Sequence, residues 1–190
     1  MIVTRRLELI PATPALVRAA LDTRAALEAA LPATVPTSWP PDLLDRAALE
    51  FVLARLAEGP AQFGWWLHFV VLVEGARRVA VGSAGYKGPP CEGAVEVGYA
   101  IVGDHQRRGY ASEALDGLVA RAFAAPAVDR VIAETLPELA PSIGVLHKAG
   151  FRLTGEGSEP GVIRFELPRG AYQDRSGRRR DGAHGIAALP

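Results

Sequence analysis

Hydrophobic positions recur along this chain with two periods, one typical of strands and the other typical of helices. Spacing of three and four residues predicts helices over residues 13–31, 42–59, 111–123 and 140–150. Alternating or continuous apolar runs predict strands over residues 2–10, 64–73, 77–88, 93–103, 128–136, 151–157 and 161–168. The resulting order, β-α-α-β-β-β-α-β-α-β-β, predicts an α/β (α+β) chain with a mixed sheet and helices on its faces.

Local signals bound the second helix and the folded part of the chain. Asp42 is the predicted N-cap of that helix and Gly59 its end. After residue 168 the periodicity is lost, so we expect one domain over residues 1–168 and a mobile tail over residues 169–190. An arginine cluster in this tail leaves contact with RNA open as a further function, although a solvated tail is the simpler interpretation.

Composition and charge exclude several classes of function. The 21 basic and 21 acidic residues balance, so no overall field attracts nucleic acid or a membrane. Cys91 is the only cysteine, which excludes disulfides within the chain and cysteine-rich zinc sites. The first residues lack the apolar stretch of a signal peptide, and the longest apolar run, residues 63–73, is about half a membrane span. We therefore expect a cytoplasmic protein.

The segment DHQRRGYASEAL, residues 104–115, combines positive charge and glycine where a helix begins. Helices usually begin with a side chain that caps the first N–H groups, but Gly109 has none. The free N–H groups and the helix dipole make such a start a site for phosphate or diphosphate. Arg107 and Arg108 can add charge-assisted hydrogen bonds, and the preceding strand ends where ligands commonly bind in open α/β sheets.

This helix start matches neither of the two common phosphate motifs. It lacks the Gly-Lys-Ser/Thr of a P-loop and the Gly-x-Gly-x-x-Gly of a dinucleotide-binding fold. The histidines show no pair at the spacing of metal ligands, so we expect no metal; they are His68, His105, His147 and His184.

Residues 106–111, Gln-Arg-Arg-Gly-Tyr-Ala, resemble the Gln/Arg-x-x-Gly-x-Gly/Ala signature of the GNAT superfamily of N-acetyltransferases, in its usual place between a strand and a helix. A second segment, residues 136–157, resembles the later helix, turn and strand of that family, with Ser142 and residues 148–151 in register. Together with VEVGY at residues 95–99, these segments resemble the branch that includes the ribosomal-protein alanine acetyltransferases RimJ and RimL.

The resemblance implies a mostly antiparallel central sheet flanked by helices, with acetyl-CoA as co-substrate and no metal. It implies direct transfer to a primary amine in a ternary complex, the acceptor being a protein N-terminus or a small molecule. The residues implied for cofactor binding are Ile101, Val102, Gly103, Gln106, Arg107, Arg108, Gly109, Tyr110 and Ala111. Dimers are common among relatives, so monomer and homodimer both stay open.

Two positions depart from the family pattern. Leu139 stands where the family often has an asparagine that contacts the cofactor, and Leu146 where many members have the tyrosine that protonates the leaving thiolate. The general acid is therefore undefined, and a non-catalytic acyl-CoA-binding sensor or interaction module stays open as a second function. For Ser142 the family implies contact with the cofactor or the leaving sulfur; the alternative is an ordinary hydroxyl in the first turn of a helix.

Glu96 is the candidate catalytic base because it is the one charged residue in a strand that is apolar on both faces and so expected to be central. A buried carboxylate must be paired or raised in pKa, and either state suits a catalytic role. The alternatives are a glutamate at the wet end of the strand or one paired with an arginine. Glu134, in the neighbouring strand, is the second candidate.

Three aromatic residues each have two interpretations. Trp39, in a proline-rich loop between the first two helices, either lines the acceptor pocket or plugs the core. In the first case its removal raises the acceptor KM and spares the affinity for acetyl-CoA. Tyr99 is interpreted as core packing rather than catalysis, and Tyr110 either belongs to the phosphate site or covers the helix N-terminus.

Overall fold

The computed structural model describes residues 1–175 of the chain. Its strands are β1 Ile2–Val3, β2 Leu7–Pro11, β3 Leu67–Glu74, β4 Arg77–Tyr86, β5 Ala94–Ile101, β6 Arg130–Thr135, β7 Arg152–Glu156 and β8 Ile163–Pro168. Its α-helices are α1 Pro14–Asp22, α2 Arg24–Ala30, α3 Arg46–Ala57, α4 Tyr110–Ala124 and α5 Ala140–Ala149. Two 3₁₀ turns, η1 Pro60–Gln62 and η2 Gly103–His105, complete the order of elements.

The first predicted helix is two helices, because a threonine stops one and starts the next. Thr13 caps α1 by accepting a hydrogen bond from the N–H of Leu16 at 3.2 Å. Thr23 adopts an extended conformation after α1 and caps α2 by accepting from the N–H of Ala26 at 3.1 Å. A hydroxyl that satisfies a free N–H group favours a new helix start over continuation of the old one.

Asp45, not Asp42, caps α3, so the predicted cap was wrong. The Oδ1 atom of Asp45 accepts from the N–H of Ala48 at 2.8 Å, and Asp45 itself has extended backbone angles. Leu43 separates the two aspartates and has a φ of 64°, a left-handed conformation that a helix cannot contain. The helix therefore begins after the second aspartate.

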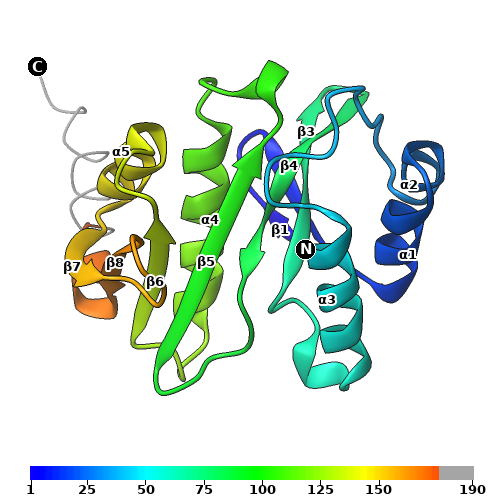
Figure 1. Cartoon of the computed structure of the whole chain (residues 1–190). Helices are drawn as coiled ribbons and strands as arrows, with labels where there is room; N and C mark the ends of the chain where they lie inside the picture. Colours follow the sequence, from blue (N-terminus) through cyan, green and yellow to red (C-terminus); the bar gives the residue numbers. More distant parts are fainter. Residues whose placement is uncertain (176–190) are drawn as a thin grey trace, which may run out of the picture.

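All the strands form one sheet in the order β1-β2-β3-β4-β5-β6-β8-β7 (Figure 1). Neighbouring strands are antiparallel except for β5 and β6, which are parallel. The long crossover that a parallel pair requires is supplied by α4, which lies between β5 and β6 in the chain. The mixed, mostly antiparallel sheet flanked by helices is confirmed.

Helices cover the two faces of the sheet unequally. On one face α4 and α5 pack on the sheet around a core that includes Leu115, Leu118 and Phe165. On the other face α1, α2 and α3 pack on the end of the sheet formed by β2, β3 and β4, around Phe69 and Val71. Figure 1 shows α4 behind β5 and α3 on the opposite side of the sheet. The second face of β5 therefore lies outside both helical layers.

β5 is central in the sheet, as expected, but only one of its two faces is buried. Val95 and Val97 belong to the core under α4. Glu96, Gly98 and Ala100 alternate with them and so lie on the opposite face, where Gly98 is exposed and the other two are half-buried. We call these three residues the open face of β5.

The parallel pairing of β5 with β6 stops half-way along β5. The last paired residues are Val97 and Ala133. Beyond them β5 continues to Ile101 and stays paired with β4 on its other side, where Ala100 faces Ser83. The edge of β5 over residues 98–101 therefore has no neighbouring strand on the β6 side.

The ordered part of the chain extends past the expected limit at residue 168. Residues 169–175 are helical, and the Arg169 guanidinium donates to the carbonyl oxygens of Phe123 at 2.7 Å and Ala125 at 2.8 Å. The ring of Tyr172 packs on Phe123, with 4.9 Å between ring centroids. The rest of the predicted tail and most of its arginine cluster lie outside the described residues.

Candidate active site

The start of α4 differs from the starts of α1, α2 and α3, which threonine or aspartate side chains cap. Gly109 occupies the N-cap position of α4 with a φ of 83°, and no side chain caps the helix. The first hydrogen bond of the helix runs from the N–H of Glu113 to the carbonyl of Gly109, at 3.1 Å. The N–H groups of residues 110–112 therefore have no partner within the helix and are available to an anion.

The loop before α4 brings the predicted cofactor residues together. Arg107 and Gly109 both have positive φ, and alternation of this kind turns successive N–H groups toward a common concavity that favours anions. Arg107 and Arg108 are exposed beside it. The side-chain amide of Gln106 donates to the carbonyl of Ile101 at 2.9 Å, which ties the loop to the end of β5. Ile101, Val102 and Gly103 thus lie next to the loop.

Tyr110 is buried, unlike the exposed residues 107–109 that precede it. It is 5% exposed and belongs to the core under α4, so its ring does not extend into solvent. Its backbone N–H stays in the first turn of α4. Ala111, half-buried next to it, adds little bulk to the same turn.

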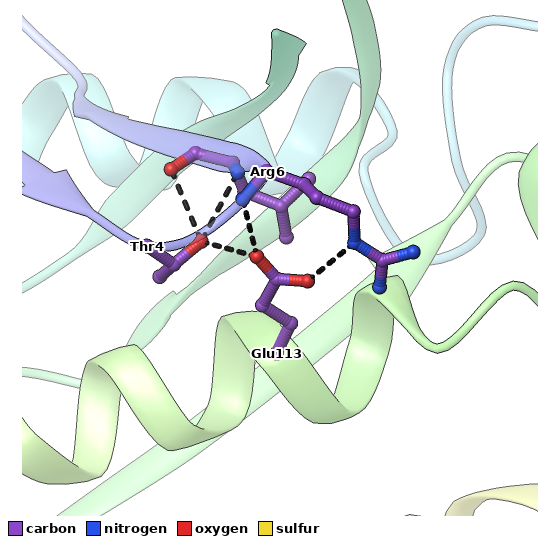
Figure 2. Close-up of polar contacts among 4 residues, drawn as sticks. Thr4, Arg6 and Glu113 are labelled. Carbon is purple, nitrogen blue, oxygen red and sulfur yellow. Dashed lines mark hydrogen bonds and ion pairs between the residues drawn. The ribbon is translucent and has the colours of Figure 1, made fainter. Parts of the chain in front are cut away.

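A polar cluster fastens the chain before β2 to the first turns of α4 (Figure 2). The Oε1 atom of Glu113 accepts from the Thr4 hydroxyl and from the backbone N–H of Arg6, both at 2.7 Å. Its Oε2 atom accepts from Nε of Arg6 at 2.7 Å. Burial opposes ionisation of Glu113, but these hydrogen bonds and the charge of Arg6 outweigh it, so the pKa of Glu113 lies below its ordinary value. The carboxylate is therefore ionised at neutral pH.

Ser142 and Tyr99 meet beside the free edge of β5. Ser142 lies in the first turn of α5, and its Oγ atom is 3.4 Å from the hydroxyl oxygen of Tyr99. The Tyr99 hydroxyl also donates to the backbone carbonyl of Ser142, at 3.3 Å. Burial raises the pKa of Tyr99, partly offset by this contact, so the phenol keeps its proton at neutral pH. Tyr99 packs against the core under α4, as expected, and in addition places a second hydroxyl next to Ser142.

Glu96 forms an ion pair with Lys87, the residue just after β4. The side chain of Glu96 is 21% exposed, so it is neither fully buried nor at the wet end of its strand. Gly98, two residues further along the open face, has empty space around the position where a Cβ would lie. The candidate base is therefore partly exposed, and its partner is a lysine, not the arginine considered from the sequence.

Glu134, the second candidate base, accepts hydrogen bonds on both of its carboxylate oxygens. Its two carboxylate oxygens accept hydrogen bonds from the N–H and hydroxyl of Ser158, at 2.9 and 2.6 Å, and from Nε of Arg164 at 2.9 Å. These bonds lower the pKa of Glu134 despite the opposing effect of burial. A carboxylate held in this way orders the loop around Ser158 and is a weak proton acceptor.

Trp39 packs on the face of the sheet that carries α1, α2 and α3. Its ring stacks on Phe69 of β3, with 6.0 Å between centroids. Phe69 pairs with Ser83, and Ser83 pairs with Ala100 on the open face of β5. Directly paired residues point to the same face of a sheet, so Phe69, Ser83 and Ala100 form a row across one face. This row runs from Trp39, stacked on Phe69, to the open face of β5.

The two leucines that replace family residues differ in their surroundings. Leu146 is 1% exposed in the core beneath α5, whereas Leu139 is 46% exposed at the start of that helix. Neither can supply or accept a proton. The hydroxyl pair of Ser142 and Tyr99 is the polar alternative that the structure offers nearby.

Residues 1–175 contain neither an arranged cluster of metal ligands nor a helix suited to span a membrane. Within this range no group of three His, Cys, Asp or Glu side chains is arranged to hold a metal ion. The helices of the same range are too short or too polar to cross a membrane.

Three residues of the site escaped the sequence analysis. Lys87 had a usable signal, because a β4–β5 hairpin pairs Tyr86 with Val97 and therefore sets Lys87 beside Glu96. Arg6 and Glu113 had no such signal, because the two partners lie 107 positions apart in the chain.

A model of the acetyltransferase (GNAT) domain matches residues 6–152, which include the loop, α4, Glu96 and Ser142. The chain belongs to the GNAT acetyltransferase family. No curated protein matches the chain significantly.

Solved GNAT structures share the fold over most of its length. An acetyltransferase from Agrobacterium tumefaciens is 24% identical, covers 88% of this chain and 93% of its own, and has a TM-score of 0.60. A GNAT-family acetyltransferase from Bacillus anthracis is 20% identical, with 88% and 97% coverage and a TM-score of 0.58. RimL, a ribosomal L7/L12 alpha-N-protein acetyltransferase solved with coenzyme A, is 17% identical, with 89% and 97% coverage and a TM-score of 0.61.

The residues at the start of this GNAT chain's α4 fit a coenzyme A diphosphate. The capless helix start offers N–H groups, and Gly109 adds no side chain of its own in front of them. The free edge of β5 beyond Val97 offers unpaired backbone groups to an extended arm. Both features are what a ligand with an extended arm joined to a diphosphate requires.

Proposed function

We propose that this chain is an acetyl-CoA-dependent N-acetyltransferase that transfers the acetyl group directly to a primary amine in a ternary complex. One observation carries the proposal: the uncapped start of α4 lies beside the end of β5, whose edge beyond Val97 has no strand partner. A single ligand with a diphosphate and an amide-rich arm satisfies both features. Acetyl-CoA is such a ligand.

In this proposal the cofactor binds along residues 101–111. The free backbone edge of β5 up to Ile101 pairs with the amides of the pantetheine arm, which passes beside Val102 and Gly103. The N–H groups of the loop and the first turn of α4 bind the diphosphate. Arg107 and Arg108 are exposed beside these N–H groups and add positive charge. The thioester then lies between the open face of β5 and the start of α5.

The reaction forms one bond and breaks one. The neutral amine nitrogen attacks the acetyl carbonyl carbon, the carbon–sulfur bond breaks, and coenzyme A leaves as a thiolate. The amine loses a proton and the thiolate gains one, so the proton count balances. Holding the amine in line with the thioester supplies up to about 7–11 kcal/mol of the barrier.

Glu96 is the proposed acceptor of the amine proton, directly or through water. It lies on the open face of β5, and a 21% exposed side chain is within reach of a bound amine. The demand on this base depends on the acceptor: an α-amine with a pKa near 8 releases its proton far more readily than a lysine near 10.4. A well-placed base contributes about 10²- to 10⁴-fold to the rate.

Ser142, with Tyr99 behind it, is the proposed donor to the leaving thiolate. The two oxygens are 3.4 Å apart, so a proton given up by Ser142 can be replaced from Tyr99. This pair takes the place of the tyrosine that many GNAT members carry at the position of Leu146. Trp39, at the end of the row that begins at Ala100, is the proposed wall of the acceptor pocket.

The test is a mass-spectrometric assay of the purified protein with acetyl-CoA and a mixed panel of peptide N-termini, polyamines and amino acids. We expect at least one acetylated amine, and we expect Glu96→Gln to lower its rate about 100-fold at unchanged acetyl-CoA affinity. Glu156→Gln, on exposed β7, is the matched control and should leave the rate unchanged.

Two outcomes would change the account. If Glu96→Gln keeps the full rate, Glu96 is not the base. If acetyl-CoA binds and no amine of a broad panel is modified, the chain is better described as an acyl-CoA sensor.

A further inference from the structure

We propose that Arg6, just before β2, is a phosphate-binding residue of the cofactor site. Its two Nη groups are assigned to the diphosphate of acetyl-CoA at the start of α4, in addition to the backbone N–H groups and to Arg107 and Arg108. The inference rests on the proposed function, because it concerns the same ligand. It adds to the site a residue about a hundred positions before the loop in the chain.

The position of the guanidinium is the first argument. Its Nη2 atom lies 3.4 Å from the place where a Cβ of Gly109 would be, so it stands directly over the N-cap residue of α4. Figure 2 shows the Arg6 side chain extending past Glu113 along the first turns of the helix. A ligand that approaches the free N–H groups of α4 meets this guanidinium at the edge of the same site.

The free donors of Arg6 are the second argument. Its Nε atom is used by Glu113 at 2.7 Å, whereas Nη1 and Nη2 make no hydrogen bond with any residue in the described part of the chain. The side chain is 32% exposed, so these groups are open to solvent. A guanidinium presents its donors as a planar fork that matches phosphate oxygens, and this fork is unoccupied by protein.

The rigidity of Arg6 is the third argument. Glu113 binds both the backbone N–H and the Nε of Arg6, and the guanidinium lies over the ring of Tyr110 at 4.6 Å from the centroid. Tyr110 is itself buried in the core, so the guanidinium rests on a fixed surface. Because the side chain is already ordered, binding costs little of the conformational entropy that a free arginine would lose.

The topology of the sheet explains how Arg6 reaches this place. β2, β3, β4 and β5 are antiparallel to one another in succession, so the beginning of β2 lies at the end of the sheet where β5 finishes. The loop after β5 leads into α4 at that same end. An arginine just before β2 therefore lies close to the start of α4.

A purely structural role is the competing explanation, since the Arg6–Glu113 pair also fastens the N-terminal strands to α4. The two roles differ in their dependence on the ligand. A clamp between elements affects every ligand of the site alike, whereas a phosphate contact affects only ligands that carry the diphosphate. S-acetyl-pantetheine, which has the thioester arm and no phosphate, is the probe that separates them.

The experiment compares coenzyme A with S-acetyl-pantetheine by calorimetry and by NMR titration, for the wild-type chain, Arg6→Gln and Arg5→Gln. Arg5→Gln is the matched control, because Arg5 is the exposed neighbour of Arg6 and its substitution removes the same charge. We expect Arg6→Gln to raise the Kd for coenzyme A about 10-fold or more, and to leave the Kd for S-acetyl-pantetheine within about twofold. Arg5→Gln should change neither.

The proposal is overturned if Arg6→Gln binds coenzyme A as tightly as the wild type, or loses affinity for both ligands equally. Should Arg6→Gln fail to fold, Arg6→Lys keeps the charge but not the fork and is compared in the same way. Failure of the wild-type chain to bind coenzyme A at all would contradict the proposed function instead, so the two failures are distinguishable.

Discussion

His68 is a polar residue in the most apolar part of the sheet. It is 1% exposed, its Nδ1 atom lies 3.2 Å from the carbonyl oxygen of Trp66, and its ring packs edge-on against Tyr86. Burial lowers the pKa of His68 to about 4; the contact with Trp66 partly opposes this effect, and the positive charge of Arg121 adds to it. The histidine is therefore neutral in the folded protein at pH values where it is protonated in the unfolded chain.

This difference predicts a loss of stability in mild acid. A histidine whose pKa is lowered by folding contributes its full stability above the unfolded value of 6.5 and loses it as the pH falls toward about 4. Between about pH 7.5 and pH 5.0 we expect the free energy of unfolding to fall by roughly 2 kcal/mol, measured by urea denaturation. His68→Asn should be less stable at both pH values and show a smaller fall.

His105 is the control for this prediction. Burial and the charge of Arg108 lower the pKa of His105 as well, but its side chain is only half-buried. His105→Gln should therefore keep most of the pH dependence. An unchanged fall in His68→Asn would show that the acid sensitivity arises elsewhere.

Among the helices, the contrast between capped and uncapped starts separates structural from functional elements. Threonine or aspartate side chains cap α1, α2 and α3, which bury their apolar faces against β2, β3 and β4. The site helix α4 forgoes such a cap, and its Gly109 adopts φ 83° at the N-cap position. Caps contribute about 1 kcal/mol each, so a helix without one gives up stability for access to its first N–H groups.

The corrected start of α3 can be tested by stability alone. Asp45→Ala removes the acceptor for the N–H of Ala48 and should lower the free energy of unfolding by about 1 kcal/mol. Asp42→Ala, at the exposed position that the sequence favoured, should change it by less than about 0.5 kcal/mol. Chemical denaturation of the three proteins at neutral pH decides between them. Equal losses in both variants would contradict the assignment of the cap.

Periodicity alone predicted β3 to β8 and the two site helices α4 and α5. The single strand expected over residues 2–10 was wrong: the N–H of Thr4 donates to the carbonyl of Leu7, and the chain turns back there into two antiparallel strands, β1 and β2. Periodicity did not predict the break at Thr23, since both halves of residues 13–31 continue one helical pattern across the threonine. It also missed the helical residues 169–175. Their packing depends on Arg169, which donates to the carbonyl groups of Phe123 in α4 and Ala125 just after it. Only the fold brings these carbonyl groups close to Arg169.

In the whole molecule, the site combines segments from both ends of the chain. The loop at residues 106–111 could be predicted, because its glycine, charges and following helix are consecutive in sequence. The contacts of Ser142 with Tyr99 and of Glu113 with Arg6 could not, because they join residues 43 and 107 positions apart. Such contacts follow from the order of strands in the sheet, which the apolar pattern does not encode.

The most direct test of the central proposal is an NMR titration of the isotope-labelled protein with coenzyme A, followed at each backbone amide. We expect saturable shifts that are largest at residues 107–111, where the helix start binds the diphosphate, and at residues 98–103, along the free edge of β5. Amides of α1 and α2 should change little. Largest shifts on α1 or α2, or no saturable change anywhere, would contradict the assignment of this site to coenzyme A.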